Sequence, residues 1–157
     1  MDLVIGLGEY LVSDKPEDKI KTYALASCVA LTVYCPTKKT LGMVHIVLPT
    51  SSINSDISKS KPGYFADIAV PLLINETCNK SLCKKSDLVI GIFGGAKSVK
   101  RPDLFNIGEK NLNETMKQLE SLGLKYTYID TGGTNSRSLE MDVETGTPKI
   151  NYQKINF

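Results

Sequence analysis

Residues 29–48 read VALTVYCPTKKTLGMVHIVL, two apolar runs separated by a short polar turn. β-Branched and other apolar residues dominate both runs, and such residues favour strands. Pro36 follows the first run and Pro49 follows the second, and proline rarely continues a strand. We therefore predict a β-hairpin whose strands span residues 29–34 and 41–48.

The rest of the chain shows strand-like and helix-like patterns without an internal repeat. Apolar positions at helical spacing, with an asparagine before them and a glycine after them, predict a helix over 107–122. A second helix is predicted after Pro62, although Pro71 conflicts with its apolar pattern. Further strands are predicted at 3–12, 20–25, 88–93 and 126–129, a second hairpin at 138–143 and 149–152, and a surface loop at 50–61. We predict one α/β (α+β) domain over 1–157, with mostly antiparallel or mixed sheets and two or three helices.

The composition is that of an ordinary globular protein. Its 157 residues suffice for a single core, with 41% hydrophobic and 23% charged residues. A net charge of +2 is too balanced for a nucleic-acid-binding surface. No apolar run reaches the length of a membrane span, and the first residues lack the basic start of a signal peptide. We expect a cytoplasmic protein that neither binds nucleic acid nor inserts into a membrane.

The chain has four cysteines, Cys28, Cys35, Cys78 and Cys83, and one histidine. No CxxC pair occurs, and a single histidine cannot complete the usual zinc patterns. We therefore expect no metal site and no cofactor. In a cytoplasmic protein we expect all four thiols to be reduced.

Cys28 and His45 become neighbours if the hairpin has one particular register. In this register Tyr34 lies opposite Leu41. Ala30 then faces His45, and Cys28 is a diagonal neighbour of His45 on the same face. Diagonal neighbours are roughly 7–8 Å apart at the backbone, a gap that a thiol and an imidazole can span. A shift of one residue would place them on opposite faces.

A cysteine and a histidine held together can act as nucleophile and general base. The imidazole takes the thiol proton, and the sulfur attacks a carbonyl carbon. Backbone N–H groups around Ser27 and Cys28 are candidates to stabilise the resulting oxyanion. Thr22, on the preceding predicted strand, is a candidate to orient the imidazole. Judged on residue types alone, ordinary buried core positions for Cys28 and His45 are the favoured alternative.

Seven short motifs follow one another along nearly the whole chain. They are IGLGEY (5–10), LASCVA (25–30), MVHIVLP (43–49), PGYFADIAV (62–70), FGGA (93–96), NIGEKN (106–111) and DTGG (130–133), with Arg137 after the last. In this order they resemble the CheD family, the receptor-glutamine deamidases of bacterial and archaeal chemotaxis. One departure is Ala26, where the family usually has glycine. Alanine is unfavourable there if the position needs positive φ or close approach of the substrate backbone.

The resemblance implies a function and a set of site residues. Cys28 would be the nucleophile, His45 the general base, and Thr22 the residue that holds the imidazole. The reaction would convert selected glutamine side chains to glutamate and release ammonia, without a cofactor. The substrate would be the helical cytoplasmic region of chemoreceptors, and the phosphatase CheC would be a partner, as for some members. The resemblance also implies a three-layer α/β/β fold.

Other readings of the same residues stay open. One alternative function is a non-catalytic module that binds CheC or chemoreceptors and in which Cys28 matters little. The glycine pairs at 94–95 and 132–133 are most simply tight turns. Asn106 is most simply a helix cap, Asn111 a polar helix position, and Arg137 a link from the sheet to Asp130.

Overall fold

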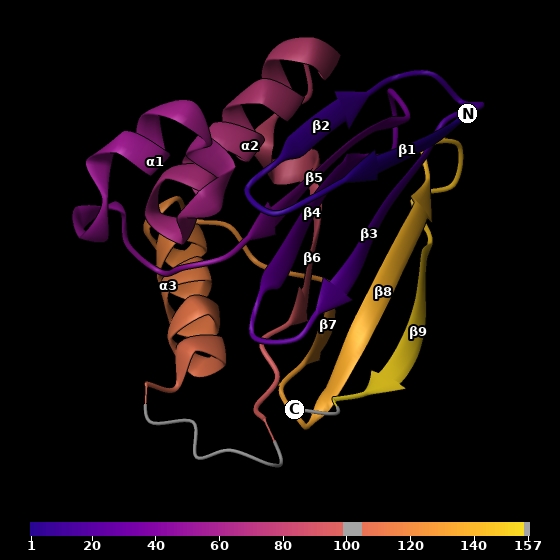
Figure 1. Cartoon of the computed structure of the whole chain (residues 1–157). Coiled ribbons are helices and arrows are strands. Elements are labelled where there is room, and N and C mark those ends of the chain that lie inside the picture. Colours follow the sequence, from indigo (N-terminus) through magenta and orange to yellow (C-terminus); the bar gives the residue numbers. More distant parts are fainter. Residues whose placement is uncertain (99–104, 156–157) are drawn as a thin grey trace.

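The computed structural model describes residues 1–98 and 105–155. Its strands form two sheets, each with parallel and antiparallel neighbours (Figure 1). The five-stranded sheet has the order β2 (Tyr10–Ser13), β5 (Thr40–Ile46), β4 (Val29–Cys35), β6 (Val89–Gly94), β7 (Tyr128–Thr131). The four-stranded sheet has the order β1 (Asp2–Ile5), β3 (Lys19–Leu25), β8 (Asn135–Asp142), β9 (Pro148–Lys154).

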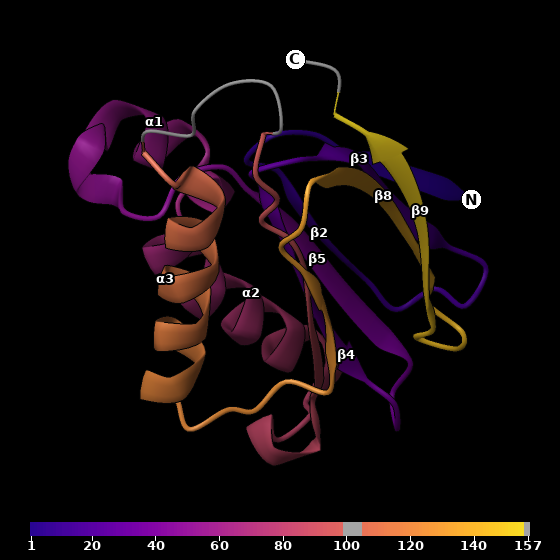
Figure 2. The same cartoon turned by 90° about the horizontal axis from the view of Figure 1, so that it is seen from below.

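The helices and the smaller sheet cover opposite faces of the five-stranded sheet (Figures 1 and 2). The α-helices of the described residues are α1 (Ser55–Ser60), α2 (Ala66–Ser81) and α3 (Ile107–Ser121), with 3-10 turns η1 (Ser51–Ile53), η2 (Pro62–Tyr64) and η3 (Lys85–Asp87). One buried cluster, which includes Leu73 and Leu119, lies between the helices and the sheet. A second, which includes Ile20 and Met43, lies between the two sheets. The predicted mixed α/β class is confirmed.

The predicted central hairpin is present, and its register is the one that places Cys28 and His45 on the same face. Tyr34 pairs with Leu41, and Ala30 pairs with His45. Both strands are buried along their whole length, because the helices cover one face and the second sheet covers the other. Leu31 accordingly packs toward the helices, whereas Ala30 packs toward the second sheet.

The prediction of one glycine-interrupted strand over 3–12 is wrong, because this segment forms two strands in different sheets. β1 pairs with β3, and β2 pairs with β5. Gly8, between them, has a φ of +74°, a conformation that glycine adopts without steric cost. The glycines therefore form the turn that carries the chain from one sheet to the other.

The predicted loop at 50–61 is also wrong in part, because it contains α1. The side chain of Asn54 caps this helix: its Oδ1 accepts hydrogen bonds from the backbone N–H groups of Asp56 and Ile57. None of the helical residues is buried. Without a buried face the segment has no apolar periodicity, which is why its sequence resembles a loop.

Both helices predicted from the sequence are confirmed. α2 continues through Pro71, and its residues on both sides of the proline, Val70 and Leu73, are fully buried. Burial of this face against the sheet outweighs the backbone hydrogen bond that proline removes. α3 begins at Ile107, as predicted, and ends one residue before the predicted end. No helix within the described residues has both the length and the apolar character needed to cross a membrane.

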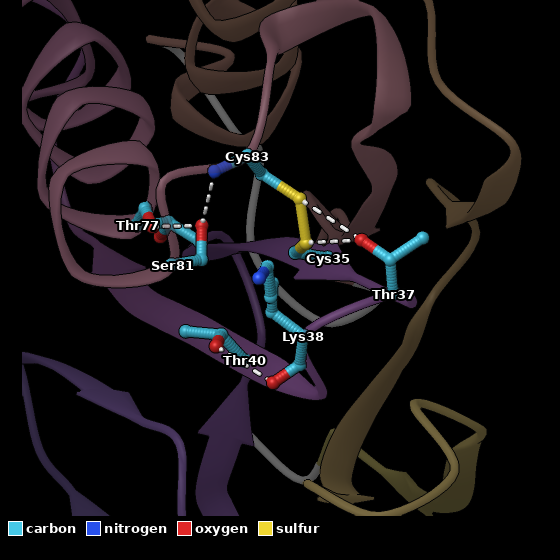
Figure 3. Close-up of a disulfide and its surroundings, with 7 residues drawn as sticks. All are labelled: Cys35, Thr37, Lys38, Thr40, Thr77, Ser81 and Cys83. Carbon is cyan, nitrogen blue, oxygen red and sulfur yellow. Dashed lines mark hydrogen bonds between the residues drawn. A yellow bond between two sulfur atoms is a disulfide. The ribbon is translucent and has the colours of Figure 1, made fainter.

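Cys35 and Cys83 form a disulfide (Figure 3). The expectation that all four thiols are reduced is therefore wrong for this pair, whereas Cys28 and Cys78 are free. Cys35 is the last residue of β4, and Cys83 follows the end of α2, so the bond ties the central sheet to its covering helix. The two cysteines are 48 positions apart. Only the packing of the helix on the sheet brings them together, so no local spacing predicts the pair.

Candidate active site

Thr22, Cys28 and His45 all lie between the two sheets. Thr22 is on β3, His45 is on β5, and Cys28 is in the short turn that joins β3 to β4. Their exposed fractions are 0%, 9% and 1%, respectively, so Cys28 keeps the most contact with solvent. Because Ala30 pairs with His45, Cys28 lies on the same face of the sheet as His45, as the register predicts.

A hydrogen bond joins Thr22 to His45 across the two sheets. The distance between Thr22 Oγ1 and His45 Nδ1 is 2.7 Å, and Thr22 Oγ1 also donates to the backbone carbonyl of Ile5 at 2.9 Å. A carbonyl can only accept, so the single hydroxyl proton of Thr22 is used there. The hydroxyl oxygen must then accept from Nδ1–H of His45. This arrangement places the ring proton on Nδ1 and leaves Nε2 with a free lone pair.

Burial keeps both the thiol and the imidazole neutral. It lowers the pKa of His45 from 6.5 to about 4 and raises the pKa of Cys28 from 9.0 to about 11. Nε2 of His45 is buried and has no hydrogen-bond partner among the described residues. At neutral pH the two groups are therefore a thiol and a neutral imidazole that are not hydrogen-bonded to each other, rather than a thiolate and an imidazolium.

The turn that carries Cys28 is held by the end of β6. Gly95 donates its backbone N–H to the carbonyl of Cys28 at 2.9 Å, and Ala96 donates to the carbonyl of Ala26 at 2.6 Å. A Cβ on Gly94 would lie only 2.3 Å from the Cys28 carbonyl oxygen. The glycine pair at 94–95 therefore supports the Cys28 turn, but it ends strand β6 and does not form the predicted tight turn.

Ala26 itself does not have a positive φ. The residue of this segment that does is Ala24, at +57°, within the irregularity where β3 shifts its pairing with β8. Alanine in this region costs energy, which the hydrogen bonds around it must offset. Alanine at position 26 therefore causes no backbone strain from a positive φ.

The turn between β1 and β2 holds the backbone of His45. Gly8 donates its N–H to the His45 carbonyl at 2.9 Å, and His45 donates its N–H to the Glu9 carbonyl at 3.1 Å. Ile5, the last residue of β1, supplies the carbonyl that accepts from Thr22. The motif IGLGEY therefore supports both the backbone and the ring of the histidine.

Asn111 differs most from its sequence-based interpretation. It is fully buried, and its Nδ2 donates to the backbone carbonyls of Ser27 and Val47, each at 2.9 Å. It is therefore no ordinary polar helix position. Its neighbours on the buried face of α3, Gly108 and Thr115, stand three and four positions away. That periodicity was the sequence signal that could have placed Asn111 inside the protein.

Two further polar residues have structural contacts. Arg137 is buried and donates from Nε to Asp130 Oδ1 at 3.0 Å and from Nη2 to the Gly132 carbonyl at 3.0 Å, so its predicted link to Asp130 is confirmed. Asn106 is at the N-cap of α3, but its side chain makes no capping hydrogen bond, and its backbone is left-handed. The predicted side-chain cap is therefore wrong, although the position is right.

Residues 1–98 and 105–155 contain no group of three or more His, Cys, Asp or Glu side chains arranged to hold a metal ion. The site instead has the His45 imidazole hydrogen-bonded to the Thr22 hydroxyl, with the Cys28 thiol on the same face of the sheet. This set can perform nucleophilic and general acid–base chemistry on an acyl carbon.

Comparison with known proteins gives consistent matches. A family model described as "CheD chemotactic sensory transduction" matches residues 47–152. The chain is 42% identical over 150 residues to "Probable chemoreceptor glutamine deamidase CheD" of Syntrophotalea carbinolica, covering 95% of this chain and 93% of that protein. It is 40% identical over 155 residues to "Chemoreceptor glutamine deamidase CheD" of Thermotoga maritima, covering 99% and 93%. A solved structure, Bacillus licheniformis hypothetical protein YfiH, has a similar fold (TM-score 0.51, 11% identity, covering 78% of this chain and 49% of that one).

Proposed function

The chain belongs to the CheD family of chemoreceptor glutamine deamidases, and we propose that it hydrolyses glutamine side-chain amides of chemoreceptors with Cys28 as nucleophile. His45 is the general base, and Thr22 holds its imidazole. The observation that carries this assignment is the hydrogen bond between Thr22 Oγ1 and His45 Nδ1, because it leaves Nε2 unprotonated. The enzyme acts in the cytoplasm on the helical cytoplasmic region of the receptors and needs no cofactor.

The first half of the reaction starts from neutral groups. The sulfur of Cys28 bonds to the amide carbon of the glutamine side chain while Nε2 of His45 takes the thiol proton. The C=O electrons move to oxygen and form a tetrahedral oxyanion. When it collapses, the C–N bond breaks, the nitrogen takes the proton from Nε2, and ammonia leaves. Because burial keeps the thiol protonated and the imidazole neutral, proton transfer accompanies the attack rather than preceding it.

Water completes the cycle by hydrolysing the thioester. Nε2 of His45 takes a proton from water as the water oxygen bonds to the thioester carbon. The second oxyanion collapses, the C–S bond breaks, and Nε2 returns the proton to the sulfur. An imidazolium forms briefly in each half, and the Thr22 oxygen accepts the Nδ1 hydrogen bond throughout.

The oxyanion is stabilised by backbone N–H groups next to Ser27 and Cys28. In a trans peptide the N–H and the C=O point in opposite directions, so holding the carbonyl also orients the N–H. Asn111 holds the Ser27 carbonyl, which orients the N–H of Cys28. Gly95 holds the Cys28 carbonyl and so fixes the other end of this turn. Donors fixed in this way need no reorganisation when charge develops on the substrate oxygen.

Mass spectrometry of a receptor cytoplasmic fragment tests the proposal. The fragment is incubated with the wild type, with Cys28→Ala, or with Cys78→Ala, which removes the other free thiol. We expect particular glutamines to become glutamate with the wild type and Cys78→Ala, and none with Cys28→Ala. Equal conversion by Cys28→Ala would refute the role of Cys28.

The alternative, a non-catalytic module that binds chemoreceptors or CheC, makes a different prediction. Such a module binds the receptor fragment but leaves its mass unchanged. Binding of CheC belongs to our proposal only as an additional interaction, and a pull-down of CheC with Cys28→Ala tests it apart from catalysis. Receptor binding by an inactive wild type would favour the alternative.

A further inference from the structure

Asn111 links the two chain segments on which the proposed chemistry depends. Its side-chain amide has two N–H donors, and each of its two acceptors is a backbone carbonyl 2.9 Å from Nδ2. One acceptor is Ser27, whose peptide unit continues into Cys28. The other is Val47, two residues beyond His45. These segments are separated in sequence from α3, so their common contact with it exists only in the folded protein.

The chemistry of the acceptors fixes the orientation of this amide. Both neighbours are carbonyl oxygens and can only accept, so the NH₂ group must face them. Asn111 Oδ1 points elsewhere and has no hydrogen-bond partner among the described residues. A buried acceptor without a partner is unfavourable. The two donated hydrogen bonds offset this cost.

The helix that carries Asn111 packs closely on the end of β6. Gly108, one turn earlier, allows α3 to approach the end of β6 closely, since a Cβ there would lie 2.6 Å from the Ala96 carbonyl oxygen. The helix that presents the amide thus packs directly on the segment that supports the Cys28 turn.

We propose that Asn111 is a positioning residue for the deamidation: its amide sets the Cys28 turn and the end of the His45 strand relative to each other. It also orients the Cys28 N–H toward the developing oxyanion, by holding the Ser27 carbonyl. The inference rests on the proposed function of Cys28 and His45. It assigns Asn111 no contact with substrate, because the side chain is fully buried.

The test compares two variants of Asn111 with two controls on the same helix. Asn111→Ala removes the donors, and Asn111→Asp keeps the shape but replaces the donors with acceptors. Asn113→Ala makes the same change at an exposed position of α3. Thr115→Ala removes a buried hydrogen bond of α3 that does not touch either segment.

Steady-state deamidation of a receptor fragment is the first readout. For both Asn111 variants we expect kcat to fall about 100-fold with little change in KM, as misplacement of reacting groups does. Both controls keep kcat near the wild-type value, even where Thr115→Ala lowers the unfolding temperature. Wild-type kcat in Asn111→Ala, or an equal loss in Thr115→Ala, overturns the proposal.

Amide hydrogen exchange without substrate is the second readout, and it does not depend on activity. In Asn111→Ala we expect the peptides that cover 25–30 and 45–49 to exchange about tenfold faster, because both lose a buried hydrogen bond. Exchange at wild-type rates in both peptides overturns the proposal. If the wild type has no deamidase activity, the proposed function fails, whereas the exchange rates still decide whether Asn111 holds the two segments together.

Discussion

Thr22 and His45 join the two sheets through a hydrogen bond of 2.7 Å between Oγ1 and Nδ1. The threonine proton is used on the Ile5 carbonyl, so the histidine must be the donor in this bond. The neutral hydroxyl therefore selects the imidazole tautomer, with Nε2 unprotonated. In the Ser-His-Asp triad a carboxylate has this role and also stabilises the imidazolium. A hydroxyl provides the geometry without the negative charge, which agrees with the low pKa of His45.

Replacing Thr22 should affect turnover more than stability. In Thr22→Val the hydroxyl is lost and the shape is kept, and we expect kcat to fall about 100-fold because the imidazole tautomer and orientation are no longer set. Thr22→Ser keeps the hydroxyl and should keep most of the activity. The control is Thr40→Val, which removes a buried strand hydroxyl that donates to the Lys38 carbonyl. Equal kcat values for the valine variants at 22 and 40 would contradict the assignment.

The pH dependence of activity should reflect the low pKa of His45. Catalysis needs a neutral imidazole, and burial lowers this pKa from 6.5 to about 4. We therefore expect kcat/KM to stay nearly constant from pH 8 to pH 5 and to fall only as the pH approaches 4. A loss of activity centred near pH 6.5 would show that the imidazole is not desolvated as the structure indicates.

The same shift predicts how stability depends on pH. The folded-state pKa of His45 lies below its unfolded value, so the unfolded state binds more protons between pH 6.5 and about 4. The contribution of His45 to the free energy of unfolding is complete above pH 6.5. It decreases by about 3 kcal/mol in total as the pH falls through this window. Urea titrations of the wild type and His45→Gln over this range measure the effect. An identical pH slope in both proteins would rule out His45 as its source.

The disulfide should stabilise the fold without taking part in catalysis. Closing a loop of 48 residues restricts the unfolded chain, and removing such a bond costs about 2–4 kcal/mol. We expect dithiothreitol, or Cys35→Ser with Cys83→Ser, to lower Tm by roughly 5–15 °C. The activity of folded protein should not change. Cys78→Ser is the control, since this thiol is free. Four titratable thiols in denatured, unreduced protein would disprove the bond.

Gly94→Ala should disrupt the turn that carries Cys28. Its Cβ would lie 2.3 Å from the Cys28 carbonyl oxygen, and Gly94 has a φ of +105°. We expect loss of activity and a decrease in the free energy of unfolding of about 3 kcal/mol or more. Gly123→Ala separates the effect of the positive φ from the effect of the steric clash. Gly123 also has a positive φ, but a Cβ there would meet no atom within 4 Å beyond its chain neighbours. That control should cost about 1 kcal/mol and keep activity.

The sequence alone predicted the central hairpin and which side chains each possible register would make neighbours. A short polar turn between two apolar strands allows few registers, and strand alternation then decides which residues share a face. The observed pairing of Ala30 with His45 selects the register in which Cys28 and His45 share a face. The helix that begins at Ile107 is likewise predictable, because its apolar periodicity and its ends lie within one short segment.

Tertiary structure decided the contacts between elements far apart in the sequence. The tautomer of His45 depends on β3 lying against β5. The two hydrogen bonds from Asn111 depend on α3 packing against the separate segments that contain Ser27 and Val47. The bond between Cys35 and Cys83 needs α2 packed on the central sheet. Local patterns record periodicity and turn chemistry, whereas these contacts depend on how whole elements pack. That packing minimises exposed apolar surface over the entire chain, so no short segment determines it.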